Sequence, residues 1–80
     1  MLLVAQAWCG DKDEGICLER IFTKQHGQEE IRLAWWSGGN QIPKPADLDA
    51  CDWVDLFSKA VAGGVFTDSE QLGMLKVLLK

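Results

Sequence analysis

The chain has 80 residues, enough for one domain, and its twelve acidic and eight basic residues give a net charge of −4. That balance disfavours direct binding to nucleic acid or to an anionic membrane, because both need clustered Lys and Arg. The 48% hydrophobic share is typical of a globular domain. The N-terminus lacks the features of a signal peptide, and three cysteines do not suit a secreted domain, so we expect a cytoplasmic protein.

Three strand-like segments come first, at residues 2–9, 16–24 and 29–36. Polar, Gly-bearing stretches at 10–15 and 25–28 separate them and have hairpin length. The sequence therefore predicts a three-stranded antiparallel meander.

Alternation is clearest in the third segment and less regular in the second. Ile31, Leu33 and Trp35 share one face, which we expect to be core, and Trp36 points to the other. Arg20 shares a face with apolar residues of the second segment while Ile21 lies opposite, which either a bulge or partial cover of both faces would explain.

Residues 37–40 (Ser-Gly-Gly-Asn) are predicted to end the sheet. Residues 41–45 follow as an extended linker, because each residue before a proline is disfavoured in a helical conformation. The chain is thus expected to form a single compact domain, with a β half at about 1–40 and an α half at about 46–80.

Two short helices are predicted in the α half. Asp52 is the expected N-cap of the first helix, Gly63 and Gly64 end it, and its apolar stripe is Trp53, Leu56, Phe57, Ala60 and Val61. A capping box begins the second at Thr67, and its apolar stripe is Leu72, Leu75, Leu78 and Leu79. The predicted fold class is α+β: a three-stranded antiparallel β-meander followed by two short α-helices packed on one face.

No sequence pattern specifies a reaction or a cofactor, so we expect no catalytic residues and no enzyme activity. A helix-turn-helix that binds DNA is disfavoured, because Asp68 and Glu70 would face phosphates at the start of the second helix. An alternative is a small metal- or thiol-dependent protein that uses Cys9, Cys17, His26 and Cys51. Their spacing lacks the short Cys or His pairs of zinc sites, so no metal is expected.

Tryptophan is abundant, with four residues in the chain, and Trp36 is the one that two helices would struggle to cover. Either it lies on the surface, or residues 41–48 or Trp8 cover it. Beside Arg32 and Ala34, it has the composition of a binding hot spot. The leading hypothesis is a small non-catalytic protein-binding module, a regulator or inhibitor, that docks this sheet face onto another protein or onto a second copy as a homodimer. In size and acidity the chain resembles small inhibitors and adaptors of phages, although no motif carries that resemblance.

A second surface feature is acidic. The alternative function it suggests is a nucleic-acid mimic that occupies a basic groove of a partner, with binding that salt weakens. Its candidate residues are Asp47, Asp49, Asp52 and Asp55.

Overall fold

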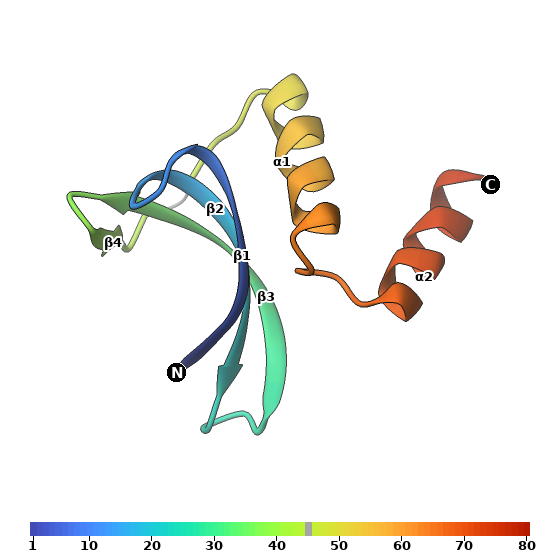
Figure 1. Ribbon diagram of the computed structural model, residues 1–80, viewed down its shortest axis with the longest axis horizontal. Helices are drawn as coiled ribbons and strands as arrows, with labels where there is room; N and C mark the ends of the chain where they lie inside the picture. Colours follow the sequence, from blue (N-terminus) through green and yellow to red (C-terminus); the bar gives the residue numbers. More distant parts are fainter. Residues whose placement is uncertain (45) are drawn as a thin grey trace.

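The computed structural model describes residues 1–44 and 46–80, in which one antiparallel sheet precedes two helices. The strands lie in the order β1-β2-β3-β4 (Figure 1). This arrangement confirms the α+β class and adds a short fourth strand. The elements are β1 (Leu2–Asp11), β2 (Glu14–Thr23), β3 (Gln28–Ser37), β4 (Asn40–Ile42), α1 (Ala50–Ala62) and α2 (Asp68–Leu78).

The sheet does not end after β3, so the prediction for residues 37–40 was wrong. Gly38 and Gly39 both have positive φ, at 60° and 77°. Two successive positive φ angles make the tight turn whose twist matches a hairpin, and glycine adopts them without a steric penalty. The chain therefore reverses and pairs β4 with β3. The predicted extended segment begins inside β4, and its last residue, Pro45, lies outside the described residues.

The first hairpin is tighter than its six polar residues suggested. Asp11 pairs with Glu14, and the turn is made possible by Asp13 at φ 67°, a left-handed conformation that Asp tolerates better than most residues. The register irregularity lies in β1, between Leu3 and Ala5, whereas β2 pairs regularly with β3. The bulge expected in the second strand is therefore not the reason for the position of Arg20.

Helix α1 packs on β1 and β2 and forms the main core with them. Leu56 and Ala60 of α1 are fully buried against Ala7 and Leu18 of the two strands. Val65 and Phe66, in the connection to α2, complete the cluster. Each large apolar side chain buried in this way stabilises the fold by about 1.5–3 kcal/mol.

The opposite face of β2 is also buried. Cys17 and Glu19 are almost inaccessible there, beneath side chains of β1 and β3. Trp8 and Trp36 pair across β2 with their ring centroids 6.2 Å apart, and the small side chain of Ala34 is buried beside Cys17. Strand β2 is thus covered on both sides.

On β3, the expected core face is the more exposed one. Ile31, Leu33 and Trp35 are 38–40% exposed, whereas Ala34 is buried and Trp36 is half-buried. The physical reason is the position of α1, which covers β1 and β2 but does not extend over β3. The alternation along β3 was predicted correctly, and the assignment of its two faces to core and surface was wrong.

Helix ends follow local chemistry. Helix α1 begins one turn earlier than predicted: its N-cap is Asp49, whose carbonyl accepts from the Trp53 amide at 2.9 Å, while Asp52 lies in the first turn. Carboxylates at both positions interact favourably with the positive, N-terminal end of the helix macrodipole. The capping box of α2 is confirmed, since the side chains of Thr67 and Glu70 each accept from the backbone amide of the other. Within the described chain, neither helix is long and apolar enough to span a bilayer.

Candidate functional site

Helix α2 leaves its apolar side chains in solvent. None of its residues is buried in the described chain, and Leu75 is 50%, Val77 64% and Leu78 74% exposed. In Figure 1 the C-terminal end of α2 stands well away from the sheet. The predicted leucine stripe exists as a helix face, but none of its side chains is buried.

Helix α1 adds exposed apolar surface beside α2. Trp53 is 42% and Val54 66% exposed, so the apolar stripe predicted for the first helix is buried only in part. A groove of about 480 Å³ runs between these residues and α2. Its lining is almost entirely apolar and consists of Trp53, Val54, Phe57, Met74, Val77 and Leu78.

A second groove, of about 410 Å³, adjoins the first and shares Phe57, Met74 and Leu78 with it. Leu72 and Leu75 contribute its apolar lining, and Asp68 and Gln71 add polar groups. We call the exposed apolar residues of the two helices, together with Leu79 just after α2, the helical surface. It consists of Trp53, Val54, Leu72, Leu75, Val77, Leu78 and Leu79.

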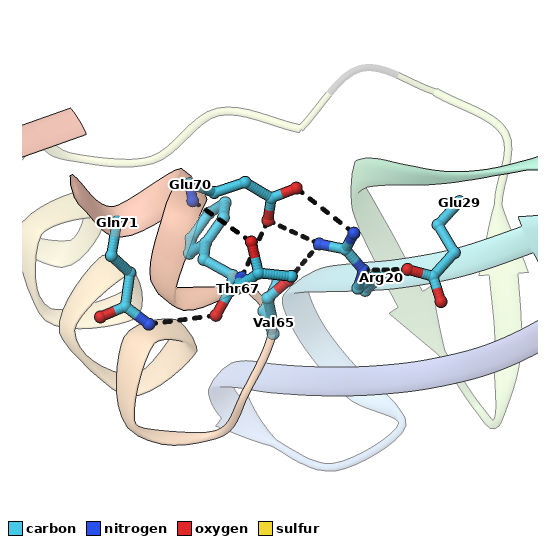
Figure 2. Close-up of polar contacts among 7 residues, drawn as sticks. Arg20, Glu29, Val65, Thr67, Glu70 and Gln71 are labelled. Atoms are coloured by element: carbon cyan, nitrogen blue, oxygen red, sulfur yellow. Dashed lines mark hydrogen bonds and ion pairs between the residues drawn. The ribbon is translucent and has the colours of Figure 1, made fainter. Parts of the chain in front are cut away.

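The start of α2 is held to the sheet by Arg20 of β2 (Figure 2). Its guanidinium donates to the Glu70 carboxylate at 2.7 Å and to the Val65 carbonyl at 3.1 Å, and its Nε donates to Glu29 of β3 at 2.6 Å. This Arg20 bridge therefore joins two strands to the segment that starts α2. It also explains why an arginine occupies the apolar side of β2.

The Arg20 bridge changes the acid–base properties of its members. The hydrogen bonds that Glu70 accepts from Arg20 and from the Thr67 amide lower the pKa of Glu70 to about 2. Conversely, the hydrogen bonds to Glu70 and Glu29 raise the pKa of Arg20. The Arg20–Glu70 pair is thus charged at neutral pH and fixes the start of α2, while the apolar part of the helix makes no contact with it.

The predicted site around Arg32 and Trp36 is largely engaged within the fold. Arg32 Nε donates to the buried Glu19 carboxylate at 2.6 Å, and Gln6 donates to the other oxygen at 2.5 Å. Trp36 packs on Trp8. Arg32 Nη2 and Trp36 Nε1 are buried without a hydrogen-bond partner among the described residues. The two predicted residues therefore lie together on one sheet face, and both contact neighbouring strands.

The four predicted acidic residues lie at and just before the start of α1, and all are exposed. Asp55 forms an ion pair with Lys59 at 3.0 Å, which raises the pKa of that lysine. The others are Asp47, Asp49 and Asp52. The structure therefore places this acidic group near the Trp53 end of the helical surface.

The proposed metal or thiol residues are not brought together. Cys9 and Cys17 project to opposite faces of the sheet, Cys51 is exposed on α1, and His26 bonds Glu30 beside the β2–β3 turn. Burial raises the pKa of the Cys17 thiol to about 12. Within residues 1–44 and 46–80, no group of three or more His, Cys, Asp or Glu side chains is placed to hold a metal.

No protein-family model matches this chain, and neither the curated proteins nor the solved structures compared with it give a match. The candidate site therefore rests on the geometry of the chain itself.

Sequence reasoning missed the Arg20 bridge and the helical surface. A signal for the first was present, since a lone arginine on an apolar strand face needs an acidic partner. A signal for the second was also present, since the apolar residues of α2 are less concentrated on one face than those of α1.

Proposed function

We propose that this protein is a non-catalytic protein-binding module that docks through the helical surface. The observation that carries the proposal is α2, a helix of 11 residues of which none is buried. The hypothesis of a binding module is retained from the sequence, and its docking surface is moved from the Arg32–Trp36 face of the sheet to α1 and α2.

Energetics support a docking role for this surface. Covering a half-exposed leucine stabilises an assembly by roughly 1 kcal/mol, and α2 offers several such side chains in one contiguous area. Large exposed apolar patches mark interaction sites on proteins, whereas single exposed apolar residues carry no such meaning. A partner that covers the helical surface would therefore gain several such contributions.

The composition of the helical surface also resembles that of an interface core. Trp53 lies at its α1 side, and tryptophan is enriched among the residues that dominate binding energy. Acidic residues of α1 border it, as polar residues border the apolar centre of an interface. The proposal therefore predicts that Trp53 contributes strongly to binding and Asp52 weakly.

Site-specific crosslinking tests the proposal. A photoreactive amino acid replaces Leu75 in one variant and the exposed turn residue Gln25 in a matched control. In the cells that produce the protein, the Leu75 position should yield one defined crosslinked species that the Gln25 position does not. Equal products from both positions, or none from Leu75, would contradict a docking role for α2.

The acidic-mimic alternative is distinguished by salt. Apolar docking persists at high ionic strength, whereas contacts of exposed carboxylates are screened over about 10 Å or less. Replacement of Asp47 and Asp52 by Asn should leave the Leu75 crosslink in place. Loss of the crosslink in that variant, together with loss in salt, would favour the acidic surface instead.

A further inference from the structure

We infer that the partner on the helical surface is a second copy of this chain, with the two α2 helices packed antiparallel about a twofold axis. This inference rests on the proposed function, because it names the occupant of the same surface. Three features of α2 carry it: the spacing of its leucines, the order of its charges and the exposure of those leucines.

The leucine spacing suits a helix of the same kind. Leu72, Leu75 and the C-cap residue Leu79 follow one another at intervals of three and four residues, and all are at least half exposed. That spacing is the apolar seam by which helices pair side by side. A seam presented by one copy can thus pack against the same seam of another.

The charges of α2 select the antiparallel orientation. Asp68 and Glu70 lie in its first turn, and Lys76 and Lys80 lie at its other end. Antiparallel packing brings the acidic end of one helix beside the basic end of the other, and opposes their macrodipoles favourably. Parallel packing would place like charges together. Because Arg20 already engages Glu70, Asp68 is the carboxylate available to the second copy.

The exposure of the leucines also fits a symmetric dimer. Leu72, Leu75 and Leu79 are 53%, 50% and 75% exposed on one side of the helix, so a second helix can cover all three. A twofold axis uses the same patch twice, so no second surface is needed. We expect micromolar affinity, so that the dimer dominates above roughly 10 µM.

Sedimentation equilibrium of the full chain tests the inference. Leu75→Glu should weaken dimerisation about 30-fold or more, because it places a charge in the seam of both copies. Leu33→Glu is the matched control, since Leu33 is similarly exposed, 40% against 50%, on β3. A dimer that survives Leu75→Glu, or that is lost only with Leu33→Glu, would overturn the inference.

Charge exchange tests the antiparallel orientation, and its result does not depend on whether Leu75→Glu folds. Asp68→Lys alone, and Lys76→Glu with Lys80→Glu in another chain, should each weaken self-association about fivefold by like-charge contact. Mixed together, the two variants should form a heterodimer of near wild-type affinity. Asp11→Lys, with the same change of net charge in a distant turn, should have no effect. Failure of the mixture to recover affinity would exclude the antiparallel arrangement.

The two proposals fail separately. A monomer at all concentrations, with a Leu75 crosslink to a different protein, would overturn self-association and leave the docking surface standing. A monomer with no crosslink would overturn both. A dimer whose crosslinked product has twice the mass of the chain is the result we expect.

Discussion

The two helices of this protein have similar length, but they differ in how strongly their apolar residues gather on one face and in what covers them. Helix α1 buries Leu56 and Ala60 completely against the sheet, and α2 buries no residue in the described chain. The helix with the more distinct apolar face packs on the sheet, and the helix whose apolar residues are spread more widely around its axis does not. The predictions that follow separate the region built on β2 and α1 from α2.

The largest expected effect lies beneath the Trp8–Trp36 pair. Glu19→Ala leaves the Arg32 guanidinium without its carboxylate, and should lower the free energy of unfolding by about 3–5 kcal/mol. Chemical denaturation measures this loss. Glu19→Gln keeps the size and one acceptor oxygen, and should cost less; an equal cost in both variants would show that charge pairing is not the cause.

Leu56→Ala and Leu75→Ala compare the two helices directly. The first opens a cavity in the core and should cost about 2–5 kcal/mol. The second removes a half-exposed side chain and should change the stability of the dilute monomer by no more than about 0.5 kcal/mol. Denaturation at a protein concentration below the dimer range measures both. A large cost for Leu75→Ala in the monomer would mean that α2 packs on its own chain.

The Arg20 bridge should have a smaller effect on global stability and a specific effect on α2. The pKa of Glu70 is lowered from its ordinary 4.5 to about 2, so its contribution to stability is present above pH 4.5 and is lost as the pH falls through about 2. In Arg20→Gln the pKa of Glu70 should return toward 4.5, so this carboxyl should become protonated at a higher pH than in the wild type. An NMR titration of the Glu70 carboxyl measures this, and an unchanged pKa in Arg20→Gln would contradict the bridge.

The smallest expected effect is on the stability of the fold, and it is measured through the reactivity of the cysteine thiols. Cys51 is exposed and should react readily with a thiol reagent in the native protein. Cys17 is fully buried, and raising its pKa from 9.0 to about 12 lowers its thiolate fraction on the order of 1000-fold. Mass spectrometry of the labelled chain should show Cys17 modified only under denaturing conditions. Native labelling of Cys17 at the rate of Cys51 would show that the Trp-covered face opens.

Much of the local structure followed from sequence. Three long strands, the capping box at Thr67 and the end of α1 at Gly63 follow from short-range rules that act within a few residues. The fourth strand also had a local signal in the Gly38–Gly39 turn. The N-cap was displaced from Asp52 to Asp49 because several acidic residues in succession all suit a helix start.

The candidate site was the part that sequence could not predict. Whether Trp36 or Trp35 faces solvent depends on which strands α1 covers, and that is set by long-range packing of Leu56 and Ala60. The same holds for Leu75, whose exposure depends on how far the connection after α1 carries α2 from the core. The periodicity of the sequence shows neither which strands α1 covers nor how far α2 lies from the core.

Hydrogen exchange of α2 as a function of protein concentration tests the central claim most directly. In a dilute monomer the amides of residues 72–79 should exchange fast, because few buried contacts hold the helix, whereas those around Leu56 stay protected. At high concentration, protection in α2 should rise while protection in α1 near Leu56 changes little. Protection in α2 that is strong and independent of concentration would contradict the claim that its apolar face is left for a second chain.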